Sequence, residues 1–171
     1  MMRRFILALA LTVIGMPGMA LGESVTSHVD TIQGIEISPG IVDTVHDIRY
    51  GAAFAAKATG ALPGAVVVAV NYTPASPGPD ITNVIIGGHW ALTVTRNGRF
   101  IGTIYGKATD GAALWDDTGT VAAINVMLAI EGGTRRFAGV TGTGAFVGTL
   151  DHGPLAVGHP PTIDGTLDLS F

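Results

Sequence analysis

From residue 48 to residue 171 the chain repeats one pattern of apolar and polar positions. Stretches of about eight to twelve residues, in which Val, Ile, Thr, Ala or an aromatic residue alternates with its neighbours, are each followed by Gly, Pro, Asn or Asp. A period of two places successive side chains on opposite faces of a strand. No helical period of 3.6 is present. The pattern predicts strands over 49–58, 64–73, 82–95, 99–107, 119–131, 137–150 and 163–171, with a short one over 112–115.

The connections are of two kinds. Asn97-Gly98, between two apolar pairs, predicts a tight hairpin because both residues tolerate the positive φ of a type I′ turn. Two other stretches, 73–80 and 151–161, are rich in proline and too long for hairpin turns, so we expect them to be loops at the mouth of a barrel.

These strands predict an all-β fold, a closed antiparallel β-barrel of about eight strands. A sheet of consecutive antiparallel strands leaves two unpaired edges unless it closes on itself. Glycines inside the strands, such as Gly87, Gly88, Gly102 and Gly106, permit the tight coiling of a small barrel. We expect the barrel to occupy 48–171 as one domain. Residues 23–47 have a mixed pattern and form an N-terminal arm or an extra strand.

The first 22 residues predict export. Two arginines precede a short apolar run and then the small residues Ala20 and Gly22, which is the layout of a secretory signal peptide. Its removal leaves 7 basic and 13 acidic residues, a net charge of 7 − 13 = −6. This balance does not favour a nucleic-acid partner. The chain has no cysteine, so stability comes from burial and backbone hydrogen bonds. We expect a secreted or periplasmic protein.

The stretch EGGTRRFAGVTGTGAF, residues 131–146, is a turn followed by a strand, and not a phosphate-binding loop, which would open a helix. It resembles the GGTGxFxxAxG signature shared by the allene oxide cyclase and dirigent barrels and by many small exported bacterial proteins. The chain departs from the signature at Arg135, where glycine is usual, and at Val140, where alanine is usual. The matching residues are Gly132, Gly133, Thr134, Arg136, Phe137, Gly139, Thr141 and Gly142.

This resemblance implies a barrel whose lumen binds an apolar small molecule and, if it is an enzyme, a cyclase or isomerase that controls the stereochemistry of ring closure or coupling. Such proteins act through shape and exclusion of water more than through acid–base groups. The match carries over no catalytic residue. A binding lumen requires a cavity of a few hundred cubic ångströms.

The candidate site residues lie on the strands around this motif. Alternation places Trp90, Leu92 and Val94 on one face of their strand and His89 on the other, and the sequence leaves open which face lines the lumen. If the lumen face is that of His89, its imidazole lies near Tyr105; otherwise His89 is on the outer wall. Glu131 is either a carboxylate at the rim or part of a salt bridge with the nearby arginines. Catalytic candidates are His89, Glu131 and Tyr105, and ligand-binding candidates are Trp90, Trp115 and Arg136.

No metal or other cofactor is expected, because no pair among His28, His46, His89, His152 and His159 has the spacing of a helical zinc site. Two alternatives to the ligand-binding barrel stay open. One is a non-catalytic exported structural or interaction barrel. The other is a small outer-membrane barrel, because residues 163–171 resemble the closing strand of such barrels. Aromatic residues make up only 6% of the chain, and residues 64–70 are apolar on both faces. We therefore expect a soluble mature protein with an apolar small-molecule ligand and no stable membrane association. The oligomeric state is left open.

Overall fold

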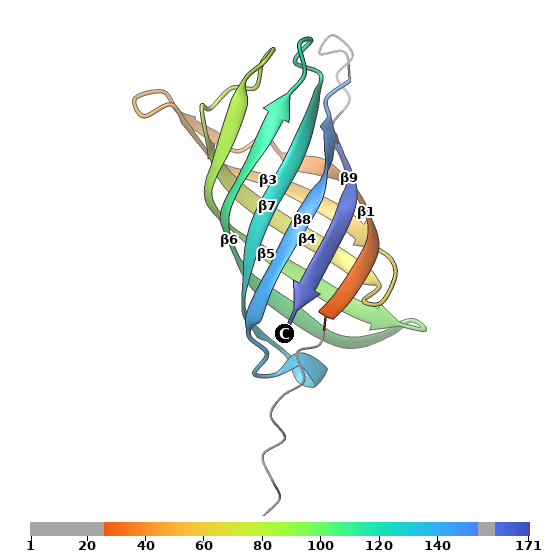
Figure 1. Ribbon diagram of the computed structural model, residues 1–171. Coiled ribbons are helices and arrows are strands. Elements are labelled where there is room, and N and C mark those ends of the chain that lie inside the picture. Colours follow the sequence, from red (N-terminus) through yellow and green to blue (C-terminus); the bar gives the residue numbers. More distant parts are fainter. Residues whose placement is uncertain (1–25, 154–159) are drawn as a thin grey trace, which may run out of the picture.

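The computed structural model describes residues 26–153 and 160–171, which form a β-barrel with almost no helix (Figure 1). One short 3₁₀ turn, η1 (Arg135–Phe137), follows β7. The strands are β1 (Thr26–Ser38), β2 (Ile41–Asp43), β3 (Ile48–Ala58), β4 (Gly64–Thr73), β5 (Thr82–Arg96), β6 (Arg99–Trp115), β7 (Val121–Gly133), β8 (Gly142–Asp151) and β9 (Thr162–Ser170).

The sheet closes through β1. From β3 to β9 each strand pairs antiparallel with the next along the chain, and β1 pairs with both β9 and β3. Eight strands therefore form a ring, and the short β2 adds only to one end of β3. The predicted all-β, closed antiparallel barrel of eight strands is confirmed. The wall begins at Thr26, earlier than residue 48, where the sequence pattern placed its start.

β6 and β8 differ most from their predicted ranges, whereas the other predicted strands agree to within two residues at each end. β6 runs without a break through Asp110-Gly111, because a bulge between Ala108 and Asp110 shifts the register with β7 and pairing resumes at Asp110 and Gly111. β8 starts at Gly142, not at residue 137, because the preceding residues form η1 and a turn. Phe137 is buried there, with its ring edge-on to Phe171 at 6.2 Å between centroids.

The turns divide the barrel into two ends (Figure 1). The upper end carries the connections 39–47, 74–81 and 116–120 and the described residues 152–153 and 160–161. The lower end carries the turns 59–63 and 97–98, the segment 134–141 with η1, and Phe171.

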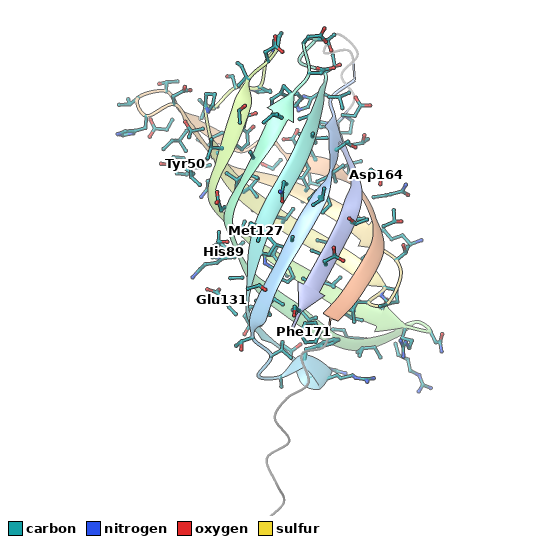
Figure 2. The ribbon with its side chains drawn as sticks, in the orientation of Figure 1. Tyr50, His89, Met127, Glu131, Asp164 and Phe171 are labelled. Carbon is teal, nitrogen blue, oxygen red and sulfur yellow. The ribbon has the colours of Figure 1, made fainter. Side chains whose placement is uncertain are left out.

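The interior is the hydrophobic core. Leu92, Ile104, Leu167 and Leu169 are the largest fully buried side chains. Glycine lets neighbouring strands approach where the wall curves: a Cβ on Gly106 would lie 1.8 Å from the Ala129 carbonyl oxygen. The wall also has exposed large apolar side chains, such as Val67, Leu114 and Met127. Figure 2 labels Met127 on the outside of the barrel.

We predict that Leu92→Ala lowers the free energy of unfolding by about 3 kcal/mol, because it leaves a cavity in a closed core. Leu114→Ala is the matched control, since Leu92 is 0% exposed and Leu114 is 55% exposed. We expect Leu114→Ala to change stability by less than about 1 kcal/mol. Urea unfolding monitored by circular dichroism measures both. Equal losses in the two variants would contradict the assignment of inner and outer faces.

Candidate functional site

The barrel contains an internal cavity of about 100 Å³. Most of its wall is apolar. Residues 66, 68 and 70 of β4, which are all valine, line it together with aliphatic and aromatic side chains of other strands. Both tryptophans of the chain, Trp90 and Trp115, line it. The cavity is smaller than the few hundred cubic ångströms expected from the sequence, because large side chains such as Phe54 and Phe146 fill much of the lumen.

Polar side chains line the same cavity toward the upper end. They are Glu36 of β1, Tyr72 of β4, Asn83 of β5, and His152, which follows β8. Each lies where its strand meets the upper end, so groups far apart in the sequence converge at one mouth. The cavity therefore has an apolar body and one polar end.

Bulges turn two of the lining side chains, Asn83 and Trp115, toward the lumen. In β5 the register shift beside Gly87 changes the alternation, so that Asn83 and Ile85 share the inner face with Gly88 and Trp90. In β6 the shift after Ala108 likewise brings Trp115 to the inner face. A bulge adds one residue to a strand and so reverses which positions face the lumen beyond it. Without these bulges, Asn83 and Trp115 would point outward.

Asn83 fixes the loop above the cavity. Its side chain is 3% exposed, and its Nδ2 donates a hydrogen bond to the Pro74 carbonyl oxygen at 2.8 Å. The Trp115 Nε1–H donates to Asn83 Oδ1. Buried polar groups that find partners in this way hold one geometry. The amide thus links the Trp115 ring to the 74–81 loop.

Arg49 provides the positive charge of the upper end. Its Nε donates to the Ala75 carbonyl oxygen at 2.7 Å, and one of its terminal nitrogens donates to the Pro39 carbonyl oxygen at 2.9 Å. The guanidinium therefore joins the 39–47 and 74–81 connections. It is close enough to Glu36, Tyr72 and His152 to influence the pKa of each.

Burial dominates the ionisation of this cluster. It raises the pKa of the Glu36 carboxyl above its ordinary value, and the charge of Arg49 offsets part of the rise. Burial also raises the pKa of the Tyr72 phenol, again opposed by Arg49. Both groups accordingly hold their protons more tightly than in water, and the protonated form of each can donate a hydrogen bond to an oxygen in the cavity.

His152 is shifted toward its neutral form. Burial lowers the pKa of its imidazole, and the nearby Asp151 carboxylate opposes this effect. The ring stands edge-on to Trp115 with 4.8 Å between centroids. A neutral imidazole offers one donor and one acceptor. The polar end therefore combines hydrogen-bonding groups of both kinds.

The predicted site residues lie in three places, which are the cavity, the outer wall and the lower end. Trp90 and Trp115 are buried against the cavity, and Trp90 Nε1–H donates to the Ala129 carbonyl oxygen at 3.2 Å. His89, Tyr105 and Glu131 lie on the exposed outer wall, where Figure 2 shows His89 and Glu131. The face of Trp90, and not that of His89, lines the lumen.

Glu131 and Arg136 have different surroundings from those considered in the sequence. Glu131 Oε1 lies 2.7 Å from Lys107 Nζ, so its ion-pair partner is a lysine of β6 and not an arginine across the turn. Arg136 is at the lower end, beside a separate hollow. Neither residue lines the cavity of the lumen.

Sequence reasoning did not select Glu36, Tyr72, Asn83 or His152. Tyr72 had a usable signal, because it continues the period-two series of Val66, Val68 and Val70. Asn83 had none, because its orientation depends on the bulge. His152 lies in a proline-rich stretch whose sequence is typical of a solvated loop, whereas its ring packs on Trp115. His28 and His159 lie outside the side chains that the structure describes.

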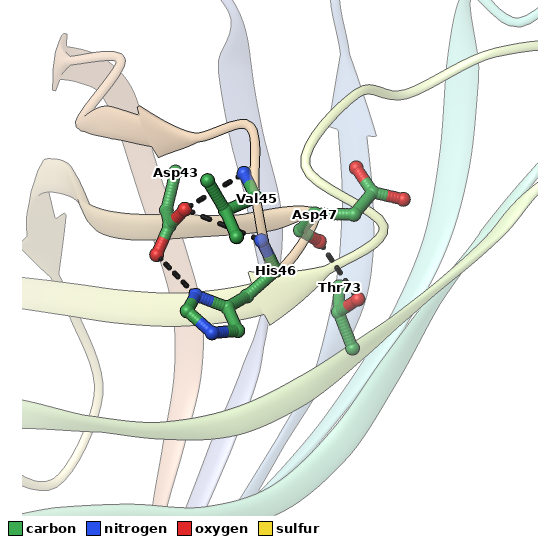
Figure 3. Close-up of polar contacts among 5 residues, drawn as sticks. All are labelled: Asp43, Val45, His46, Asp47 and Thr73. Carbon is green, nitrogen blue, oxygen red and sulfur yellow. Dashed lines mark hydrogen bonds and ion pairs between the residues drawn. The ribbon is translucent and has the colours of Figure 1, made fainter.

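A second histidine–carboxylate pair, at the β2–β3 turn, has a structural role (Figure 3). Asp43 Oδ2 lies 2.7 Å from His46 Nδ1, and Asp43 Oδ1 accepts hydrogen bonds from the backbone N–H groups of Val45 and His46. The hydrogen bond from His46 lowers the pKa of the Asp43 carboxyl. The Thr73 hydroxyl donates to the Asp47 carbonyl oxygen at 2.8 Å and ties this turn to β4. The pair is exposed and lines no cavity.

We predict that Glu36→Gln is more stable than the wild type at pH 7. A carboxyl with a raised pKa in the folded state contributes stability below its unfolded pKa and loses that contribution as pH rises through the folded pKa. Glutamine stays neutral, so the gain should shrink as pH falls toward 4. Urea unfolding at both pH values measures it, with Glu131→Gln as an exposed control. A variant less stable than the wild type at pH 7 would show that the fold requires the Glu36 charge.

Within the described residues, no group of three His, Cys, Asp or Glu side chains is placed to hold a metal ion. The same part of the chain has no helix of the length and apolarity needed to span a membrane. Comparison of the chain with protein-family models, with characterised proteins and with solved structures finds no match.

Proposed function

We propose that this protein is an exported barrel that binds a small, largely apolar molecule carrying one polar group inside its lumen. The observation that carries the proposal is the cavity with apolar walls and a single polar end. Small-molecule sites have this composition, in which apolar side chains supply affinity and a few polar groups fix orientation.

The polar end gives the ligand a direction. The Tyr72 phenol and the Glu36 carboxyl are suited to donate hydrogen bonds, and His152 can donate or accept. An oxygen of the ligand belongs at this upper end. The apolar body belongs deeper, against Trp90 and Phe146.

The volume restricts the size of the ligand. An engineered apolar cavity of about 150 Å³ takes benzene, and ordinary ligand pockets measure about 300–1,000 Å³. The cavity of about 100 Å³ is smaller than the engineered benzene site and as it stands fits a short chain. A single ring such as a phenol, or any longer ligand, requires half-buried side chains such as Val68 and Tyr72 to move.

Catalysis is an extension of this proposal. The resemblance to allene oxide cyclases implies a cyclase or isomerase, which would hold a reactive molecule in one shape and exclude water. In this chain, the groups placed to exchange a proton with a molecule in the cavity are Glu36, Tyr72 and His152. His89, Tyr105 and Glu131 line the outer wall and cannot reach it directly.

A non-catalytic structural or interaction barrel is the second candidate. The small cavity and the exposed apolar side chains of the outer wall favour it. An outer-membrane barrel has less support, because such barrels are apolar outside and polar inside. Here the lumen is apolar, whereas Lys107, Glu131 and Asp164 are exposed on the outer wall.

We predict that 4-fluorophenol binds the wild type and that Ala56→Leu raises its Kd at least tenfold, because the larger side chain occupies the cavity. Ala55→Leu is the matched control, since Ala55 and Ala56 are neighbours on β3 and only Ala56 lines the cavity. Fluorine NMR of the ligand measures both. Failure of the wild type to bind, or equal binding by both variants, would favour the structural barrel.

We predict that Tyr72→Phe weakens binding of 4-fluorophenol about threefold to tenfold, the effect of one hydrogen bond. Binding of fluorobenzene, which has no hydroxyl, should change less. His89→Ala should leave both affinities unchanged, because His89 is on the outer wall. The same fluorine NMR titrations apply. An equal loss for the two ligands in Tyr72→Phe would count against a polar contact at the upper end.

A further inference from the structure

Positive charge is concentrated at the lower end of the barrel. Four of the five arginines in the described residues stand there: Arg96 at the end of β5, Arg99 at the start of β6, and Arg135 and Arg136 in η1. The lower turns 59–63, 97–98 and 134–141 contain no aspartate or glutamate. The upper connections contain Asp43, Asp47, Asp80, Asp116 and Asp117. The barrel is therefore electrically polarised along its axis.

An apolar hollow of about 290 Å³ opens among these arginines. Arg96 and Arg136 line it together with Ala61 of the 59–63 turn, and no aspartate or glutamate does. Its other lining residues are apolar: Leu62, Val94, Ile101, Phe137, Val140 and Phe171. It shares no lining residue with the cavity of the lumen.

The two arginines have no anionic partner in the described part of the chain. Neither takes part in the ion pairs of that part of the chain, which include those of Asp43 with His46 and of Glu131 with Lys107. Arg135, in contrast, lies over the Phe100 ring, 4.6 Å from its centroid. Arginine stems pack on apolar surface while the guanidinium stays in water. Arg96 and Arg136 therefore bring unpaired positive charge to the rim of an apolar hollow.

We propose that this hollow binds one amphiphile with an anionic head and an alkyl chain of about eight carbons. The head pairs with Arg96 and Arg136, and the chain lies against Leu62, Val94 and Phe137. The volume of about 290 Å³ is at the lower limit of ordinary ligand pockets, which suits a single chain. The site is at the opposite end from the lumen's polar cluster, and the inference does not depend on the function proposed above.

Calorimetric titration with octanoate, at concentrations where it is monomeric, tests the site. We expect the wild type to bind octanoate at least tenfold more tightly than octanol, which lacks the charge. It should also bind octanoate at least tenfold more tightly than butanoate, because each buried methylene contributes about fourfold in Kd. The double variant Arg96→Gln/Arg136→Gln should raise the Kd for octanoate at least tenfold and leave the Kd for octanol unchanged. Arg99→Gln, an exposed arginine of the same end that does not line the hollow, should change either affinity less than twofold.

A filling variant checks the location. Ala61 is exposed in its turn, so Ala61→Trp should block the hollow and abolish octanoate binding without disturbing the core. The proposal is overturned if the wild type does not bind octanoate, or if octanoate binding survives Ala61→Trp and is lost in Ala56→Leu. It is also overturned if the arginines bind vesicles of anionic phospholipid but not monomeric octanoate, which would indicate a membrane-facing surface.

Discussion

Closure of the sheet by β1 is the constraint on which the rest of the structure depends. β1 forms backbone hydrogen bonds with β9 on one side and with β3 on the other, and so joins the two ends of the β3–β9 sheet. Removing β1 would leave two long unpaired edges. It would also open the lumen, whose cavity includes Ile32 and Glu36 of that strand. Fold and candidate site therefore depend on the same pairing.

The closed wall separates side chains that face the lumen from side chains that face outward. Near the upper end, bulges in β5 and β6 change which residues face the lumen. Below the bulges, alternation gives an apolar lumen around Leu92 and Ile104. Above them, the shifted alternation turns Asn83 and Trp115 inward. Bulges commonly redirect side chains beside functional sites. At the polar end of the cavity, Asn83 therefore depends on a bulge, whereas Glu36 and Tyr72 face the lumen through the ordinary alternation of their strands.

Much of the fold could be predicted from the sequence. Eight stretches with a period of two indicate strands, and a closed barrel is the arrangement that leaves no unpaired edge strand. The bounds of β4 agree with the prediction residue by residue. Less of the candidate site could be predicted from the sequence. The orientation of His89 depends on which face of β5 is inside, and periodicity alone does not distinguish two apolar faces. Glu36 lies in a segment whose mixed pattern concealed its strand. A bulge such as that at Gly87 cannot be located from alternation, because glycine interrupts the pattern in either case.

On the proposed function, a small apolar molecule enters the lumen and does not bind the outer wall. Intermolecular nuclear Overhauser effects from 4-fluorophenol to labelled valine and leucine methyl groups distinguish the two locations. We expect contacts from the ring to Val126 and Leu128, which line the cavity. Contacts only to Val67 and Val147, which are exposed on the outer wall, would contradict it.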